Sequence, residues 1–477
     1  MLKSFETNVK LLFVSIAALF LLGLAYSMLT DFWPAVFLPA GILLLFYIIP
    51  NIELPYHVLL LTVPLSFPME KILPVRLDFP DELLQLLITG LMAFYFIKKK
   101  NIYKASFFTH PFTLFVLASF AWTFLATLGS SDVAFSAKFL VKKTWFLVPF
   151  FFFGFGYFFQ SRNLRIGFGA MFSVLTIIVL SVMYKAKGVG FNFSDVHDPI
   201  QPFFKNHVMY GSMISCFFFA VLGAYWVGRK GSVYRFLLLL SIPLYLIAVY
   251  FSYSRGAWGA VLFGVGMMIA IRIRLGRYII PVIYTLILAL VLWLSHENTY
   301  LQFRPRFDKT VMHEDLTDHL MATLQGTDIS SAERYHRWIA TMRMSQDYPI
   351  FGVGPNKFYD NYPSYAITEY RTWVSRNIEK STTHNYFLFM LAEQGWVGML
   401  LYAGLIVFIF WRGQRIYFQC SSVNDRRIVL AILGMMAAVF VNNFFSELLE
   451  TDKIGSLFYI GLAILVGFDS KTVRTEA

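Results

Sequence analysis

The chain has 477 residues, of which 57% are hydrophobic and only 14% are charged. Soluble globular domains carry about 25% charged residues, so this composition argues against a soluble enzyme and favours a protein embedded in lipid. The net charge of +12 would suit nucleic acid, but the basic residues lie in short clusters between apolar runs, which is typical of a membrane protein that follows the positive-inside rule.

Runs of about 18 or more apolar residues predict membrane helices. The chain has about fourteen such runs, and twelve or thirteen are also compatible with the pattern. The expected spans are 11–29, 32–50, 55–67, 83–97, 111–129, 144–159, 165–183, 208–228, 235–253, 256–272, 277–295, 386–411, 428–446 and 453–468. We therefore expect an all-α integral membrane protein with about 12–14 transmembrane helices.

Every second connection between these spans is basic, which predicts that these connections face the cytoplasm. They are 98–104, 162–165, 229–235, 272–277 and 412–427. The alternate connections then face outward, and they are 67–82, 130–143, 184–207, the turn around Ser254-Arg255 and the long segment 296–385. The expected organisation is a transmembrane bundle over 1–295, an outward loop domain over 296–385 and C-terminal transmembrane helices over 386–477.

The outward segment 296–385 is rich in Trp, Tyr and Phe, which argues against disorder. Its stretch "SSAERYHRWIATMRMSQ" at 330–346 predicts a helix, because Ser330 or Ser331 can cap it and Glu333 fits the first turn. The stretch "DYPIFGVGPNKF" then ends that helix with Pro and Gly. The helix would place Arg334 and Trp338 on one face, at positions i and i+4.

Arg255 is the first candidate for chemistry. An ionised arginine at bilayer depth costs about 3 kcal/mol by insertion scales, so such residues usually face a cavity or a partner. The small residues Ser252, Ser254 and Gly256 would let another group approach it closely. Guanidinium binds phosphate through two parallel hydrogen bonds, so Arg255 predicts a phosphate site. An arginine that snorkels to lipid headgroups is the alternative.

Other basic residues could contribute to the same site. Lys138, Lys142 and Lys143 lie in the outward connection 130–143, and Lys138 and Lys142 would share a face if it is helical. Ordinary binding to lipid phosphates explains them equally well. Arg334 or the adjacent Arg337 could bind a second phosphate while Trp338 packs down, although a solvated helix face is an equal alternative.

His384 stands where the long loop returns to an apolar helix that Thr382 or Thr383 could cap. Histidine titrates near neutral pH and suits proton abstraction from a sugar hydroxyl, although a structural role is common at such positions. Glu393 lies two and a half turns further on, so it should not pair with His384 along one helix. His207 is a weaker candidate at the start of another helix.

The sequence lacks a phosphate-binding GxxxxGK[ST] loop, an HExxH or CxxC motif and an Asp-rich cluster at the membrane edge. We therefore expect no metal site and no cofactor. Three stretches, however, resemble the O-antigen ligase superfamily, which includes O-antigen ligases, O-antigen polymerases and bacterial O-linked oligosaccharyltransferases. They are "YSRGAWGAVL" at 253–262, "ERYHRWIATMRMSQDYPIFGVGPNKF" at 333–358 and "THNYFLFMLAEQGWVGMLLY" at 383–402.

The motif residues that carry the resemblance are Ser254-Arg255-Gly256 with Trp258, Arg334 with Trp338, Pro349 with Gly352, Gly354 and Phe358, and His384-Asn385 with Glu393, Gly395 and Gly398. The N-terminal half of the chain is similar only in hydropathy. The pair Tyr386-Phe387 is bulkier than the common pattern, which puts the detail of the acceptor side in doubt. The three motifs together are specific, whereas each alone would be weak.

The resemblance implies a membrane glycosyltransferase of the GT-C type in the bacterial inner membrane, with one large periplasmic loop and a periplasmic active site. It implies metal-independent transfer, with inversion, of a glycan from undecaprenyl diphosphate to an acceptor hydroxyl. Lipid A-core is the acceptor of a ligase, while a polymerase uses another glycan and an oligosaccharyltransferase uses a protein. The sequence does not distinguish these acceptors.

The resemblance also implies roles for individual residues. His384, Arg255 and Arg334 would be catalytic, and the two arginines would bind the donor diphosphate. We add Lys138 and Lys142 to the diphosphate site because of their charge. We also name Glu393, Asn385, Trp338 and His207 as candidates for supporting roles, His207 from its position alone. A transporter of an anionic lipid or sugar is the alternative from another class, but it should carry its charges near the middle of the membrane on broken helices.

Overall fold

The computed structural model describes residues 52–68, 78–98, 103–193, 195–303, 329–367 and 382–476. The chain divides into two units, Met1–Leu59 and Leu60–Ala477, and nearly all described residues belong to the second. The expected spans 11–29 and 32–50 lie outside the described residues. The described part is α-helical apart from one pair of two-residue strands, β1 (Phe67–Pro68) and β2 (Asp78–Phe79), which run antiparallel with Phe67 opposite Phe79.

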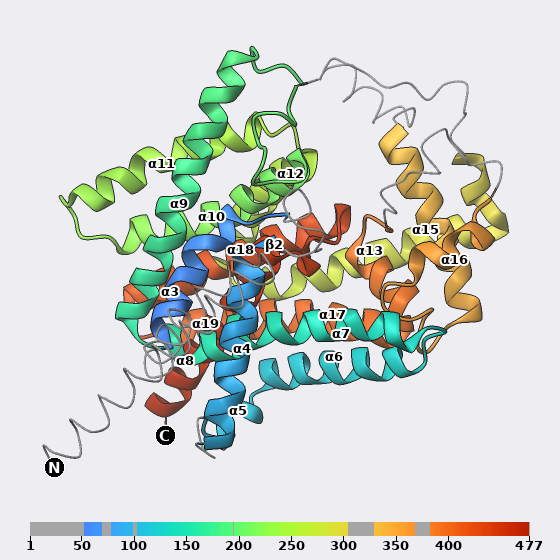
Figure 1. The fold of residues 1–477 in the computed structure, drawn as a ribbon, viewed down its shortest axis with the longest axis horizontal. Coiled ribbons are helices and arrows are strands. Elements are labelled where there is room, and N and C mark those ends of the chain that lie inside the picture. The colour runs from blue at the N-terminus through green and yellow to red at the C-terminus, as the bar shows by residue number, and fades with distance from the viewer. Residues whose placement is uncertain are drawn as a thin grey trace, which may run out of the picture. The chain divides into compact units, whose positions relative to one another are not determined.

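Ten helical segments of the described part are long and apolar enough to cross a membrane. They are α6 (Pro111–Leu128), α7 (Val133–Leu147) continued by η4 (Val148–Phe153) and α8 (Gly154–Phe158), α9 (Ser161–Gly188), α10 (His207–Val227), α11 (Val233–Tyr250), α12 (Arg255–Arg272), α13 (Gly276–Ser295) continued by η5 (His296–Phe303), α17 (Tyr386–Gln419), α18 (Val423–Phe445) and α19 (Asp452–Glu476) (Figure 1). The expectation of an all-α, multi-pass membrane protein is confirmed.

The remaining helices are shorter or more polar. They are α3 (Glu53–Thr62), η2 (Val63–Leu65), α4 (Asp81–Lys98), α5 (Ala105–Phe108), α15 (Ile329–Asp347), α16 (Phe358–Tyr365) and η8 (Leu448–Glu450). The helix expected over 330–346 is therefore present as α15. The expected loop domain over 296–385 remains a prediction, because residues 304–328 and 368–381 of it lie outside the described residues.

Three expected elements differ from the structure. The expected span 55–67 overlaps α3 (Glu53–Thr62), which has only 10 residues. The expected span 83–97 lies in α4, which has 18 residues but begins with Asp81 and Glu82 and ends with Lys98. The segment 130–143, expected as a connection, is mostly helix α7. The Asp132 side chain accepts a hydrogen bond from Phe135 N at 3.0 Å, so the helix begins at Val133 and not at residue 144.

Helices α10, α12 and α18 pack against one another along their length, and small residues let their backbones approach closely. A Cβ placed on Gly264 of α12 would lie 2.2 Å from the Phe219 ring of α10 and 2.9 Å from the Gly434 carbonyl oxygen of α18. The Ser212 hydroxyl of α10 also donates a hydrogen bond to the Asn442 side chain of α18 at 2.8 Å. This packing fixes where α12 begins, and hence the position of Arg255.

The close contact at Gly264 predicts that alanine substitutions at Gly264 and Gly266, two glycines of α12, differ in their effect on the unfolding midpoint. Gly264→Ala should lower the unfolding midpoint of the purified protein in detergent, because overpacking a tight contact costs about 1–3 kcal/mol. Gly266→Ala is the matched control, since its added Cβ would meet nothing within 4 Å. The measurement is thermal unfolding followed by tryptophan fluorescence, and equal midpoints for the two variants would contradict the packing.

Candidate functional site

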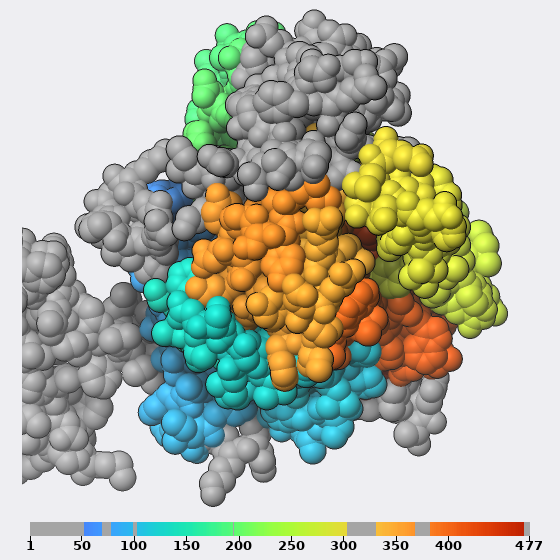
Figure 2. Space-filling view, turned by 90° about the vertical axis from the view of Figure 1, so that its right-hand side faces the viewer, coloured from blue at the N-terminus to red at the C-terminus, as the bar shows by residue number. Residues whose placement is uncertain are grey.

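Three connections that should face the same side of the membrane meet at one end of the helices. They are the turn 251–254 before α12, residues 382–385 before α17 and residues 446–451 between α18 and α19. Helices α15 and α16 lie over this end (Figure 1), and Figure 2 shows their orange surface between the cyan surface of α6 and α7 and the yellow surface of α13. The sequence-predicted candidates of the C-terminal half lie here.

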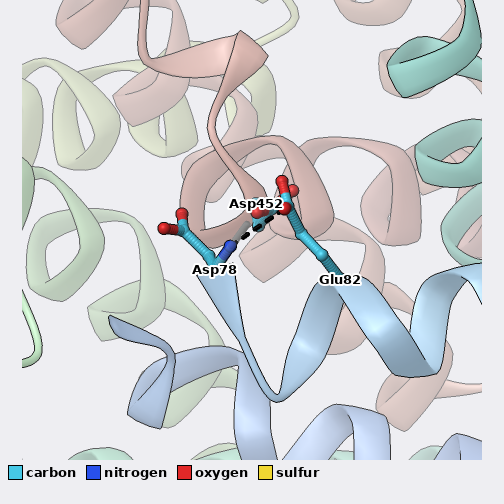
Figure 3. Close-up of side chains that lie close together, drawn as sticks. All are labelled: Asp78, Glu82 and Asp452. Carbon is cyan, nitrogen blue, oxygen red and sulfur yellow. Dashed lines mark hydrogen bonds between the residues drawn. The ribbon is translucent and has the colours of Figure 1, made fainter. Parts of the chain in front are cut away.

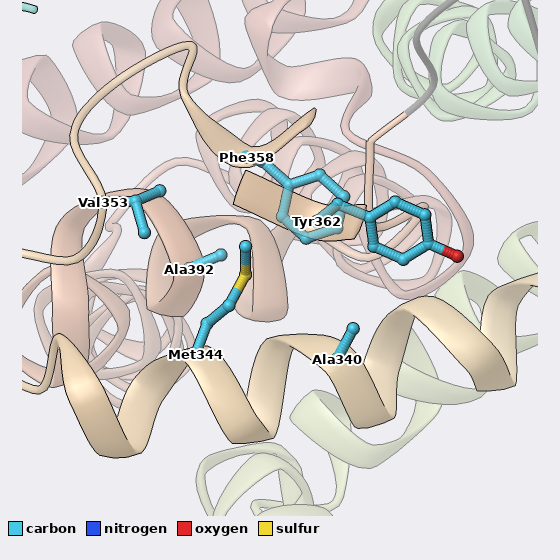
Figure 4. Packing of buried hydrophobic residues seen from close by; sticks show 6 residues of the cluster. All are labelled: Ala340, Met344, Val353, Phe358, Tyr362 and Ala392. Atoms are coloured by element: carbon cyan, nitrogen blue, oxygen red, sulfur yellow. The ribbon is translucent and has the colours of Figure 1, made fainter. Parts of the chain in front are cut away.

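The segment between α15 and α16 is docked onto the first turns of α17. Val353 N donates a hydrogen bond to Ala392 O at 2.8 Å, and Trp396 N donates to Pro349 O at 2.9 Å. Gly395 has φ +68°, and a Cβ there would lie 2.0 Å from the Ile350 carbonyl oxygen, so only glycine fits. Beneath this docked segment lies an apolar cluster of buried residues shown in Figure 4, which comprises Ala340, Met344, Val353, Phe358, Tyr362 and Ala392.

Glu393 holds this docked segment in place. Its side chain is 1% exposed, and its carboxylate accepts hydrogen bonds from Asn356 N at 2.8 Å and Phe358 N at 3.3 Å. These are backbone donors at the start of α16, where a carboxylate is favoured by the helix dipole. As expected, Glu393 does not pair with His384 along α17, and its contacts suit a supporting role for the loop.

His384 lies in the turn that leads into α17, with a positive φ of 52°. Such a conformation is strained for a residue other than glycine and is enriched at functional sites. Its Nδ1 lies 4.0 Å from a carboxylate oxygen of Glu447. Burial lowers the pKa of His384 to about 4; the Glu447 charge opposes this shift, and the charges of Arg337 and Arg334 reinforce it. The imidazole is therefore neutral at physiological pH.

Hydrogen bonds hold the turn around His384 on both sides. The Trp338 indole donates to Thr383 O at 3.0 Å, and the Thr383 hydroxyl donates to Glu447 at 3.0 Å. The Asn385 amide donates to Phe444 O at 3.2 Å. The helix cap was predicted wrongly, because Asn385, and not Thr382 or Thr383, caps α17 by accepting bonds from the backbone N–H groups of residues 387 and 388.

Helix α15 brings its basic residues to this turn. Trp338 contacts the turn directly, and Arg334 precedes it by one helical turn on the same face. Arg334 is partly exposed, whereas Arg337 is 5% exposed and lies 3.6 Å from Glu333. Both arginines lie close enough to His384 to lower its pKa. The structure thus brings two of the sequence-predicted residues, Arg334 and His384, to one place.

Arg255 is the first residue of α12 and is partly exposed. The turn before it is closed by Trp258, whose indole donates to Val249 O at 2.8 Å, and Ser254 caps the helix. A Cβ on the neighbouring Gly256 would lie 3.4 Å from the Phe445 ring. Because Phe445 is two residues before Glu447, Arg255 lies beside the connection that contacts His384.

The predicted lysines have other contacts. Lys142 forms an ion pair with Glu82 at 2.8 Å, and Lys143 with Glu450 at 3.1 Å. Lys138 is exposed and lies 5.6 Å from the centre of the Phe135 ring. A diphosphate role for Lys138 and Lys142 therefore stays a prediction.

His207 starts α10 and lies near His197, with the ring centres 5.1 Å apart. Nothing in its described contacts joins it to the turn at His384.

Glu447 and Glu450 were not among the residues predicted from the sequence. Glu450 accepts hydrogen bonds from the Tyr386 hydroxyl at 2.6 Å and from Lys143 at 3.1 Å, so it ties α17 to α7. The signal in the sequence was the acidic stretch "SELLETD" between two apolar helices, where a short outward turn has no other reason to carry three acids.

The role of Glu393 predicts a local effect of its amide variant. Glu393→Gln keeps one acceptor oxygen but turns an NH₂ group toward a backbone N–H, and an unsatisfied buried donor costs about 1–3 kcal/mol. Chymotrypsin should then cut faster at Tyr348 and Phe351, which lie in the docked segment. Asp360→Asn is the control, because that carboxylate is 51% exposed and pairs with the Lys357 ammonium at 3.1 Å. Equal cutting of both variants would contradict the anchoring role.

Comparison with known families agrees with these motifs. Residues 236–403 match the family model described as O-antigen ligase, a region that covers α12, α15, α16 and the first half of α17. No curated protein matches the chain. The matched region contains Arg255, Arg334 and His384, and the predicted resemblance to the O-antigen ligase superfamily is confirmed over residues 236–403.

Proposed function

We propose that this protein transfers a glycan from undecaprenyl diphosphate to a hydroxyl of lipid A-core at the periplasmic face of the bacterial inner membrane. The observation that carries the proposal is the grouping of a neutral His384 with Glu447, Arg334 and Arg337 beside the start of the helix that carries Arg255. A base next to fixed cations suits a reaction in which a hydroxyl attacks and a diphosphate leaves.

The cations act on the leaving group. As the bond between the anomeric carbon and the diphosphate oxygen breaks, its electron pair moves onto that oxygen. Arg255 and Arg334 stabilise this charge through hydrogen bonds that are already oriented, which is the largest single contribution in many enzymes. In this proposal the guanidinium groups supply the positive charge, so no metal ion takes part in the reaction.

His384 acts on the acceptor. The neutral imidazole takes the proton of the acceptor hydroxyl while the hydroxyl oxygen bonds to the anomeric carbon on the face opposite the diphosphate, which inverts that carbon. Such a base contributes about 10²–10⁴ in rate. Glu447, 4.0 Å from Nδ1, stabilises the imidazolium that forms. The strained φ of His384 supports a role that depends on its exact orientation.

Lipid A-core is one of three acceptors that members of the superfamily use. A polymerase would offer another glycan chain to the same base, and an O-oligosaccharyltransferase a protein Ser or Thr. A transporter is disfavoured, because Arg255, His384 and Glu447 lie at helix ends rather than at the middle of broken helices.

The proposal predicts that substitutions at the two ends of α12 differ strongly in their effect on glycan transfer. Arg255→Ala should reduce glycan transfer by the purified protein about 10²–10³-fold, since one lost charge-stabilising donor typically has this effect. Arg272→Ala is the matched control, because Arg272 is the last residue of the same helix and lies on the opposite side of the membrane in the proposed orientation. Near-normal transfer by the folded Arg255→Ala protein would refute the diphosphate role.

The same assay resolves the acceptor. Undecaprenyl-diphosphate glycan is offered with rough lipopolysaccharide, with free glycan and with a Ser/Thr peptide in turn. Transfer to rough lipopolysaccharide alone is expected. Transfer only to glycan or only to peptide would replace the ligase assignment with one of the two relatives and leave the donor chemistry intact.

The lowered pKa of His384 predicts that kcat/KM stays high at an unusually low pH. The pH dependence of kcat/KM reports the free enzyme. With a pKa of about 4, the imidazole stays neutral at pH 5.5, and kcat/KM there should remain close to its value at pH 7.5. A histidine with the ordinary pKa of about 6.5 would retain roughly a tenth.

Glu447→Gln provides the matched variant for this pH profile. Since Glu447 raises the pKa of His384, its removal should not move the acid limb toward higher pH. Samples returned from pH 5.5 to pH 7.5 must recover full activity, which separates titration from denaturation. A tenfold loss at pH 5.5 in the wild-type protein would contradict the assignment.

A further inference from the structure

A second cluster of charged residues lies where α4 and α19 begin, away from His384. The cluster has three members. Asp78 lies in β2, Glu82 in the first turn of α4, and Asp452 is the first residue of α19. One carboxylate oxygen from each of the three lies within 4.8 Å of the others. Figure 3 shows the Asp452 and Glu82 side chains converging, with the Asp78 backbone N–H bound to Glu82.

Two acids in this region are buried without a hydrogen-bond partner in the described part of the chain. Asp452 is 3% exposed and Asp81 is fully buried. No carboxylate oxygen of either residue forms a hydrogen bond of normal distance and angle, although the Gln85 side chain lies beside Asp452. A buried ionised carboxylate is stable only when it is paired or coordinates a metal. Asp452 points into the cluster that Glu82 and Asp78 form, so its oxygens are available there.

The described cations do not balance these acids. Lys142 is paired with Glu82 at 2.8 Å. Lys453 is 6% exposed, but its ammonium group donates to three backbone carbonyls, those of residues 63, 64 and 66, at 3.0–3.2 Å. Four carboxyl groups, including Asp81, therefore face two ammonium groups. The two helix N-termini add about half a positive charge each, which still leaves an excess of negative charge.

We propose that Asp78, Glu82 and Asp452 bind one divalent cation of the oxygen-preferring class, Mg²⁺, Ca²⁺ or Mn²⁺. Such ions take carboxylate ligands at about 2.0–2.6 Å, so ligand oxygens spread over as much as 4.8 Å can surround one ion. All three ligands are oxygens, which disfavours the softer transition metals. Asp78 is partly exposed, so it provides an entry side and room for bound water.

The ion would support the site at His384 without taking part in the reaction. It would join β2 and α4 to the first residue of α19, immediately after η8. Glu450, the last residue of η8, binds Tyr386 and Lys143. A cation at Asp452 therefore fixes one end of the short connection whose other end carries Glu447. This role does not depend on the proposed transferase chemistry.

The test is direct binding of Mn²⁺ to the full-length protein in detergent, measured by the loss of the free-ion signal in electron paramagnetic resonance. The wild-type protein should bind one tightly held Mn²⁺ per chain, in competition with Ca²⁺ or Mg²⁺. Asp452→Asn should abolish this site. Asp78→Asn, at the exposed edge and hence compatible with folding, should weaken it at least tenfold, as changes around metal sites typically do.

Asp360→Asn is the matched control, because Asp360 is an exposed acid on α16 that pairs with Lys357. It should bind Mn²⁺ as the wild-type protein does. The proposal is overturned if the wild-type protein holds no tight Mn²⁺, which would mean that Asp81 and Asp452 are protonated instead, or if Asp78→Asn and Asp360→Asn bind Mn²⁺ equally well. Neither result bears on glycan transfer, so the two proposals fail separately.

Discussion

The candidate site depends on the hydrogen bonds that hold residues 383–385. On one side the turn is bound to α15 through the Trp338 indole. On the other side Thr383 donates to Glu447 in the α18–α19 connection, and Asn385 donates to the last turn of α18. Because these groups are buried, each lost bond leaves a polar atom without water, which costs more than the bond itself contributes. The turn therefore holds His384 in a strained conformation and brings together helices that are far apart in the sequence.

The same end of the molecule shows how lipid limits the placement of charge. Lys142 and Lys143 occur in a helix that should span the membrane, and each is paired with an acid from another element. If either lysine were unpaired, its charge would cost several kcal/mol inside a membrane-spanning helix. The acids Glu82 and Glu450 are thus explained by the lysines that they bind. Asp452 lies near Lys142 and Asp81 near Lys453, but neither acid forms a hydrogen bond to its lysine.

Much of this arrangement could be predicted from local sequence. The apolar runs predicted a membrane protein. The capping residues, together with the Pro and Gly that follow, predicted helix α15. Both signals depend only on neighbours within a few residues. The joint spacing of Arg255, Arg334 and His384 indicated the family. Hydropathy failed for α7, since a helix start set by Asp132 and lysines neutralised from elsewhere do not appear as an apolar run.

Contacts between distant segments could not be predicted in this way. The role of Glu393 depends on backbone N–H groups of residues 356 and 358 in a loop that precedes it by more than thirty positions. Glu447 gains meaning only once the turn at His384 is folded against it. Asp452 and Glu82 are separated by most of the chain, and no spacing rule joins them.

The acidic connection between α18 and α19 couples the candidate site to other helices. Glu447, Glu450 and Asp452 lie within six residues, yet each faces a different element: the turn at His384, the pair of Tyr386 with Lys143, and the start of α4. A connection this short cannot shift at one acid without moving the other two. The position of the carboxylate beside His384 is therefore set by contacts on α7 and α4, which lie outside the residues 236–403 that match the family model.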